Sequence, residues 1–145
     1  MKKKRIRPLA ICVFRNRDRI LVNEGYDPVK KQTFYRPLGG GIEFGEKAED
    51  TVRRELMEEI NVEVGEVCYL GTLESIFTFN GAMGHEIVMV FDGVLVNFGL
   101  YEQAVIEGKE ANGDVIRAIW MRLDDFGEGK SVLYPNGLLE LLNQD

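Results

Sequence analysis

Apolar and polar residues alternate along most of the chain in the manner of strands, and two stretches repeat at a helical period. Apolar runs typical of strands cover residues 9–14, 19–23, 33–36, 62–79, 85–97 and 116–123. Turn residues follow at 15–18, 80–84 and 123–126, and polar stretches at 25–32 and 103–114 predict loops. The helical periods lie at 47–60 and 135–142. This order predicts a mixed sheet between helices.

The helix predicted at 47–60 carries acidic residues next to its apolar side. The apolar side repeats every four residues, at Ala48, Val52, Leu56 and Ile60. Glu55, Glu58 and Glu59 have i, i+3 and i+4 spacing, so their carboxylates share a stripe about 100° wide that borders the apolar side. Carboxylates this close repel one another unless a cation lies among them. The alternative is a solvated acidic face with pairs such as Glu49 and Arg53.

A glycine run at 39–41 and a glutamate, Glu46, precede this helix. Glycines let the backbone turn tightly and approach a ligand closely. At a usage of about 5–7% per residue type, this glycine, glutamate and acidic-helix combination arises by chance on the order of once in 10⁸ positions. The segment therefore favours a metal site with oxygen ligands over a merely solvated face.

These residues resemble the Nudix box, G-x5-E-x7-R-E-U-x-E-E-x-G-U, in which U is aliphatic. The matching positions are Gly40, Glu46, Arg54, Glu55, Leu56, Glu58, Glu59 and Val62. Asn61 stands where the pattern has a left-handed glycine, and asparagine is the next most tolerant residue there. Upstream, Pro37-Leu38 reverses the Leu-Pro order of many relatives, although the glycines keep their register. The flanking pattern suits the family over nearly the whole chain, which implies one α/β domain over 1–145 with the Nudix α/β/α sandwich.

The resemblance also implies a chemistry, the hydrolysis of a diphosphate linkage in a nucleoside diphosphate linked to another moiety. Mg²⁺ or Mn²⁺ would bind the Gly39 carbonyl and the carboxylates of Glu55, Glu58 and Glu59, neutralise phosphate oxygens and lower the pKa of water. Glu55 is expected to accept the proton of the attacking water. Arg54 and Glu46 are expected to form an ion pair that orients the carboxylates.

Four residues beyond these are candidates for the site. Glu110, in the loop expected at 103–114, is a candidate further metal ligand, with a solvated loop glutamate as the alternative. Arg36 is a candidate phosphate contact, with a surface arginine as the alternative. Gly40 and Gly41 would let the substrate approach the backbone.

The strand at 85–97 adds a further candidate, because Glu86 shares one face with Val88 and Val90. A carboxylate among apolar neighbours suggests a pocket wall that contacts substrate, and an edge-strand charge is the alternative. His85 is expected to be a hydrogen-bonded structural residue. One or two of five aromatic residues are expected to stack on a nucleobase: Tyr26, Phe34, Tyr35, Phe77 and Phe79.

Composition and net charge limit the classes of binding partner that are expected. The 145 residues are 45% hydrophobic, which suits a single core, and no apolar run approaches the roughly 20 residues of a membrane span. A net charge of −6 argues against extended nucleic-acid binding. The basic segment 2–7 is expected to be a solvated lead-in to the first strand, although contact with nucleic acid is the alternative. Cys12 and Cys68 are expected to be core thiols, and a cytoplasmic location is expected.

Two other functions remain open. A binding module recognises a nucleotide without cleaving it, but such proteins usually lack box glutamates. Isomerisation of an allylic diphosphate usually accompanies a degraded box and a catalytic cysteine. The expected partner is a small nucleotide diphosphate, with ADP-ribose, oxidised nucleoside triphosphates, dinucleoside polyphosphates and sugar nucleotides all open, and the resemblance favours a homodimer.

Overall fold

A mixed sheet of nine strands forms the centre of the computed structural model, which describes residues 4–144. Its first part has the order β5-β6-β1-β4, with bounds Val64–Phe79, Ala82–Leu95, Ile6–Asn16 and Leu38–Gly41. β1 runs parallel to β6, and the other pairings in this part are antiparallel. The second part has the order β7-β8-β2-β3-β9, with bounds Val105–Lys109, Val115–Arg122, Arg19–Asp27, Gln32–Arg36 and Val132–Leu133. The end of β1 pairs with β2 and joins the two parts.

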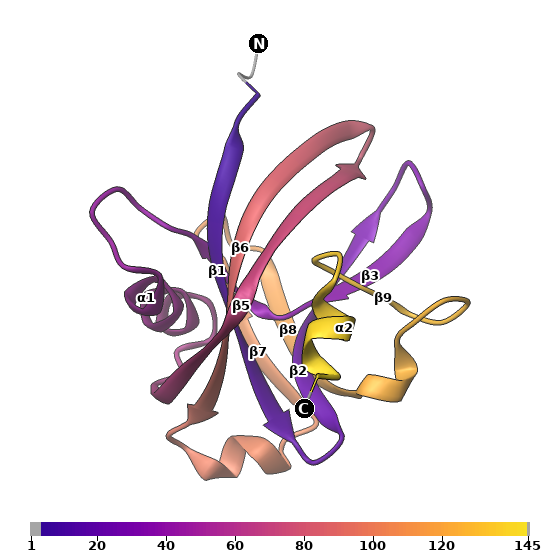
Figure 1. Ribbon diagram of the computed structural model, residues 1–145. Helices are drawn as coiled ribbons and strands as arrows, with labels where there is room; N and C mark the ends of the chain where they lie inside the picture. Colours follow the sequence, from indigo (N-terminus) through magenta and orange to yellow (C-terminus); the bar gives the residue numbers. More distant parts are fainter. Residues whose placement is uncertain (1–3, 145) are drawn as a thin grey trace.

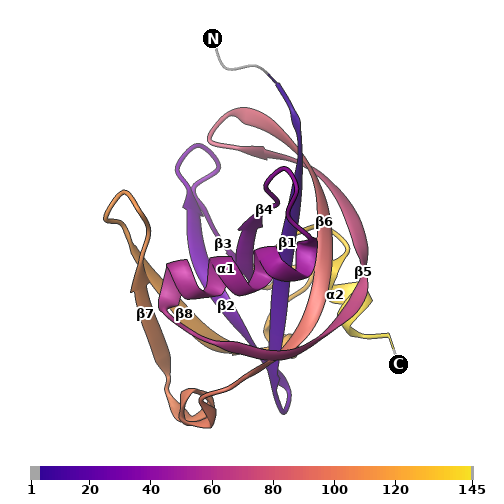
Figure 2. The ribbon, with the colours of Figure 1, turned by 90° about the vertical axis from the view of Figure 1, so that its left-hand side faces the viewer.

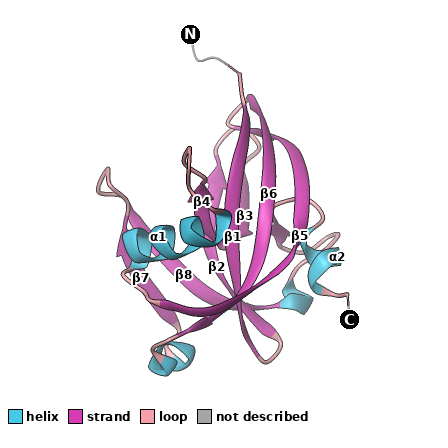
Figure 3. Cartoon of the chain, turned by 60° about the vertical axis from the view of Figure 1, so that its left-hand side comes forward, coloured by secondary structure: helices cyan, strands magenta, loops and turns pink. Residues whose placement is uncertain are grey.

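Helices cover the two sides of this sheet. α1 (Ala48–Ile60) lies on one side and the short α2 (Leu138–Leu142) on the other, as Figure 1 and Figure 3 show. Two 3₁₀ turns, Phe98–Glu102 and Leu123–Asp125, lie in connections. Figure 2 shows α1 lying across the strands, with the short β4 next to β1. The predicted mixed sheet between helices is therefore confirmed.

The alternation of side chains along β1 explains why both sides need a helix. Ala10, Cys12 and Phe14 are buried in the core that includes Val52 and Leu56 of α1. The intervening residues belong to the core on the α2 side, at Leu9, Ile11 and Val13. A strand that is apolar on both faces is stable when both faces are covered.

Four local predictions were wrong. β2 continues to Asp27, into the predicted loop 25–32, because it pairs with β3. The loop predicted at 103–114 contains β7, which pairs with β8 and buries Ile106. The glycine run is not a turn but strand β4, which pairs with β1. The C-terminal helix begins at Leu138, after Pro135.

The C-terminal end of α1 follows the predicted pattern, whereas its first turn has no side-chain cap. Lys47 precedes the helix with extended backbone and makes no side-chain cap. Asn61 ends it in the left-handed conformation at φ 55°, and the chain N–H groups there bond the carbonyls of Leu56 and Met57. Asparagine therefore replaces the box glycine in the conformation that the glycine would adopt.

The two cysteine thiols differ in burial. Cys12 is buried in the α1-side core, as expected. Cys68 is exposed on the edge strand β5, so the prediction of a second core thiol was wrong, because neither hydrophobic core extends to its side chain. Lys2 and Lys3 of the basic segment lie outside the described residues. None of the described helices has the length and apolar content of a membrane span.

Candidate active site

Arg54 and Glu46 form the expected ion pair, with two hydrogen bonds. Arg54 Nε donates to Glu46 Oε2 at 2.8 Å, and Nη2 donates to Oε1 at 2.9 Å. The Thr51 hydroxyl donates to the same carboxylate at 2.7 Å. These donors, Arg54 first, lower the pKa of Glu46 to about 2. Glu46 is therefore a fixed anion that holds the guanidinium in one orientation.

The rest of the Arg54 guanidinium connects the helix to β4. Nη1 donates to Glu55 Oε1 at 3.0 Å and lies 3.3 Å from Glu58 Oε2. Nη2 also donates to the Gly41 carbonyl at 3.1 Å. One arginine thus positions the Glu55 carboxylate against the end of the glycine strand.

Glu55 and Glu59 form a crowded pair of carboxylates. Burial, followed by the negative charge of Glu55, raises the pKa of Glu59 to about 8, and Glu110 adds to this while Arg36 opposes it. Burial also raises the pKa of Glu55, against the effect of Arg54. Glu59 Oε1 is buried and has no hydrogen-bond partner among residues 4–144. Arg36 thus offsets the crowded negative charge only in part, and within residues 4–144 no hydrogen bond completes Glu59 Oε1.

The glycines of β4 let the backbone reach this pair. A Cβ at Gly40 would lie 2.5 Å from the carboxyl carbon of Glu55, so any side chain there would displace the carboxylate. Gly39 has φ +153°, and a Cβ there would lie 2.2 Å from the Ala10 carbonyl oxygen. The sequence predicted both a tight turn and a close approach at these glycines. The turn was wrong, because the glycines lie in strand β4, where they allow the close approach.

The carboxylate pair fits a divalent cation. Glu59 has a buried oxygen without a hydrogen-bond partner among residues 4–144 and a raised pKa, and the Glu55 carboxylate lies against the Gly40 backbone. Closely spaced carboxylate oxygens of this kind are the ligands that a divalent cation prefers. Within residues 4–144, no three acidic, histidine or cysteine side chains already converge as a ligand cluster. Glu58 is 57% exposed and faces Arg54, so only Glu55 and Glu59 are crowded together.

The other predicted ligands lie around this pair. Glu110 is exposed, just after β7, and lies close enough to Glu59 to raise its pKa. β7 is held against the end of α1 at Gly108, where a Cβ would lie 1.8 Å from the Glu59 carbonyl oxygen. The ligand roles of Gly39, Glu58 and Glu110 stay predictions.

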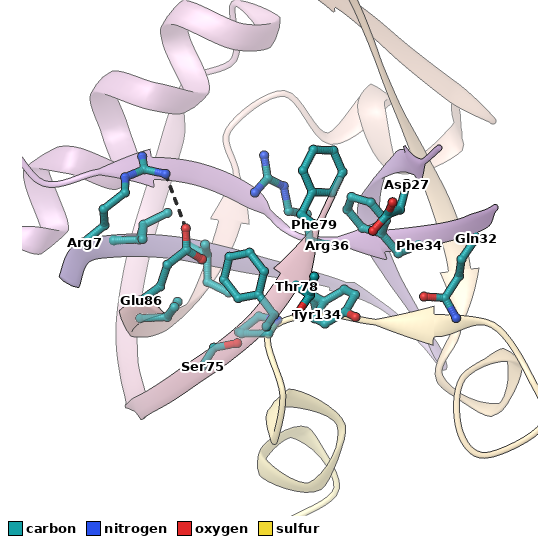
Figure 4. Close-up of a pocket in the computed structure, with 15 residues that line it drawn as sticks. Arg7, Asp27, Gln32, Phe34, Arg36, Ser75, Thr78, Phe79, Glu86 and Tyr134 are labelled. Atoms are coloured by element: carbon teal, nitrogen blue, oxygen red, sulfur yellow. Dashed lines mark hydrogen bonds and ion pairs between the residues drawn. The ribbon is translucent and has the colours of Figure 1, made fainter. Parts of the chain in front are cut away.

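A pocket of about 250 Å³ opens on the other side of the sheet, and we call it the aromatic pocket (Figure 4). Its lining comes from five strands and the C-terminal segment, and its aromatic members are Phe34, Phe77, Phe79 and Tyr134. Phe34 makes edge-to-face contacts with Phe79 and Tyr134, at ring-centroid distances of 5.8 and 5.5 Å. Leu9, Ile11 and Val88 form part of its floor, which is the α2-side face of the sheet.

Two arginines lie between the aromatic pocket and the box. Arg36 lines the pocket and also lies within electrostatic reach of Glu59. Arg7 lines the pocket, pairs with Glu86 at 3.4 Å, and its Nη2 would lie 3.7 Å from a Cβ at Gly41. Sequence reasoning missed Arg7 because it treated the residue as part of a solvated basic terminus. Its place on a strand next to apolar residues was the available signal.

The structure agrees with some of the remaining predictions and not with others. Glu86 lines the pocket, and β6 lies between β5 and β1, so it is not an edge-strand charge. His85 Nε2 lies 2.9 Å from Glu74 Oε2, in keeping with a hydrogen-bonded structural residue. Tyr26 and Tyr35 do not line the aromatic pocket, whereas the other three aromatic candidates do. Ser75 and Tyr134 also line it, and no sequence pattern marked them.

A family model, the NUDIX domain, matches residues 4–140. The chain belongs to the Nudix family. This membership confirms the predicted fold family and the expectation of a Nudix hydrolase. No curated protein matches the chain.

Solved structures share the Nudix fold. A MutT NUDIX hydrolase from Burkholderia pseudomallei has a TM-score of 0.68 and 19% identity, over 98% of this chain and 100% of that one. A NUDIX hydrolase from Nitrosomonas europaea has a TM-score of 0.62 and 16% identity, over 95% and 86% of the two chains. A mutator MutT protein from Bacillus halodurans has a TM-score of 0.59 and 16% identity, over 96% and 81%.

Proposed function

We propose that this Nudix domain hydrolyses a diphosphate linkage in a nucleoside diphosphate linked to another moiety, with Mg²⁺ or Mn²⁺ as cofactor. The observation that carries the proposal is the carboxylate pair of Glu55 and Glu59. Glu59 Oε1 is buried with no hydrogen-bond partner among residues 4–144, and the Glu55 carboxylate lies against the backbone of Gly40. A binding module has no need for a carboxylate pair that is crowded in this way.

The cation would be held by Glu55 and Glu59, with Glu58, Glu110 and the Gly39 carbonyl as further candidates. When bound, it supplies charge neutralisation for phosphate oxygens and activation of water.

The chain itself positions and deprotonates the attacking water. Glu55 accepts the proton from water, and burial favours this by raising the pKa of its carboxyl group. Arg54 holds the Glu55 carboxylate through Nη1, and Glu46 fixes Arg54 from the opposite side. Water then attacks one phosphorus, and the other phosphate leaves.

The substrate would lie across the two sides of the sheet. Its diphosphate would lie near β4, where Gly40 and Gly41 permit close approach and Arg36 and Arg7 supply charge-assisted hydrogen bonds. Its nucleoside would enter the aromatic pocket, which Glu86 borders. The proposed substrate is a small molecule, and no nucleic-acid or membrane partner is proposed. We further propose that the chain forms a single domain, assembles as a homodimer and acts in the cytoplasm.

The test separates by ion-exchange chromatography the hydrolysis products of a panel of nucleoside triphosphates, ADP-ribose, dinucleoside polyphosphates and sugar nucleotides, each incubated with Mg²⁺, with Mn²⁺ and with chelator. Metal-dependent turnover of one class supports the proposal and names the substrate group. Tight nucleotide binding without turnover of any compound would place the binding module first.

A further inference from the structure

The aromatic pocket contains two polar side chains whose hydrogen-bonding capacity is not filled within residues 4–144. Ser75 is 1% exposed, and its hydroxyl has no hydrogen-bond partner among residues 4–144. Glu86, whose side chain is 13% exposed, bonds within that range to Arg7 alone, through Oε2 at 3.4 Å. An unused buried hydroxyl is costly unless a ligand completes its hydrogen bonds.

These two side chains lie side by side. Ser75 on β5 and Glu86 on β6 are direct partners in the antiparallel register, and both line the pocket. Direct partners point to the same face of a sheet, with Cβ atoms about 5 Å apart. Together they therefore present a hydroxyl next to a carboxylate along one wall (Figure 4).

Two other charged side chains that line the pocket, Asp27 and Arg36, are engaged elsewhere. Asp27 accepts hydrogen bonds from the backbone N–H groups of Val29 and Lys30 at 3.0 and 3.1 Å. Although burial opposes it, these backbone donors and that of Asn80 lower the pKa of Asp27. Arg36 lies within reach of Glu59, on the phosphate side. Ser75 and Glu86 are the pair that the strand register places side by side on one wall, away from these two groups.

We propose, on the basis of the function proposed above, that Glu86 and Ser75 select a guanine base. A carboxylate paired with arginine only accepts hydrogen bonds, and a serine hydroxyl can donate one. Guanine presents two adjacent donors, its ring N1–H and its 2-amino group, next to the O6 acceptor. Adenine and cytosine place an acceptor beside their amino donor, and uracil flanks its one donor with two carbonyls, so each would set an acceptor against the carboxylate.

The apolar walls of the pocket also suit a flat nucleobase. Phe34, Phe77, Phe79 and Tyr134 offer ring faces and edges to a flat base, which is the usual way in which a protein holds one. A sugar in this place would leave hydroxyl groups against phenyl rings without partners.

The test measures binding of nucleoside monophosphates by calorimetry in Mg²⁺, where hydrolysis of a diphosphate cannot interfere. GMP and IMP are matched ligands, because they differ only in the 2-amino group that would donate to Glu86. We expect the wild-type protein to bind GMP more tightly than AMP, CMP or UMP, and about tenfold more tightly than IMP. Equal affinity for GMP and IMP, or no binding of any of them, would overturn the proposal.

Glu86→Gln is the matched variant, since it keeps the shape and replaces one acceptor with a donor. The ratio of GMP to IMP affinity is expected to fall to about one in this variant and to persist in the control Glu74→Gln, which alters an exposed carboxylate outside the pocket. A ratio that survives Glu86→Gln would contradict the assignment. If Glu86→Gln does not fold, the ratio of GMP to IMP affinity in the wild-type protein still tests the proposal. Ser75→Ala provides a second test, because it should weaken GMP binding more than UMP binding.

Measurement of turnover distinguishes a failure of guanine selection from a failure of the proposed hydrolase activity. Guanine selection without hydrolysis of any guanine nucleotide would sustain the recognition and refute the hydrolase. Metal-dependent hydrolysis with equal affinity for all bases would do the reverse.

Discussion

The two sides of the central sheet hold different kinds of interaction around one substrate path. On the α1 side, Arg54 organises Glu46 and Glu55 through direct hydrogen bonds, and one oxygen of the Glu59 carboxylate has no hydrogen-bond partner within residues 4–144. On the α2 side, the aromatic pocket is largely apolar, and Glu86 and Ser75 lie side by side on one of its walls. The charged side suits chemistry at phosphorus, and the apolar side suits recognition of a base. Changes on the first are expected to alter kcat, and changes on the second to alter KM.

The largest effect is expected from Glu55→Gln. The amide cannot accept a proton from water, so kcat on the best substrate is expected to fall about 10³-fold at saturating metal. Steady-state kinetics with the same substrate gives the ratio. Turnover near the wild-type rate would show that another group is the base.

Gly40→Ala tests the close approach of β4 to the carboxylate pair. The new methyl group would lie 2.5 Å from the Glu55 carboxyl carbon, so the carboxylate must move, and a loss of about 10²-fold in kcat is expected. Gly41→Ala is the matched comparison, because its Cβ would meet only Arg7 Nη2 at 3.7 Å. Its loss is expected to be at least tenfold smaller, and equal losses would refute this role for Gly40.

Arg54→Ala tests whether Arg54 holds the two carboxylates in place, because a residue with that role contributes to stability as well as to rate. Removing the guanidinium leaves Glu46 and Glu55, each with 17% of its side chain exposed, without their partner. The free energy of unfolding is expected to fall by about 2 kcal/mol, less than for a fully buried pair. Chemical denaturation measures it. Glu49→Gln, which removes an exposed pair with Arg53, is expected to change it by less than about 0.5 kcal/mol.

Phe79→Ala is the smallest of these changes and acts on the other side of the sheet. Loss of one stacking face is expected to raise KM about tenfold and to leave kcat within about threefold. Phe98→Ala, an exposed phenylalanine outside the pocket, is the control and should change neither. A fall in kcat without a rise in KM would remove the distinction between the two sides.

The same contrast explains how much the sequence could predict. The box residues from Gly40 to Val62 are contiguous, and helical spacing places Glu55 and Glu59 together with no knowledge of the rest of the fold. The aromatic pocket brings Arg7, Ser75 and Tyr134 together from distant parts of the chain, through strand pairings that local patterns do not encode. β7 was missed for a related reason, because its pairing with β8 outweighs the polar composition of 103–114.

Binding of Mn²⁺ to the substrate-free protein, followed by electron paramagnetic resonance, tests the central claim most directly. Wild-type protein is expected to bind Mn²⁺, Glu59→Gln to bind it at least tenfold more weakly, and Glu49→Gln, on the same helix, to bind it as wild type does. Unchanged Mn²⁺ affinity in Glu59→Gln, or no binding by the wild-type protein, would contradict the assignment of a cation to the carboxylate pair.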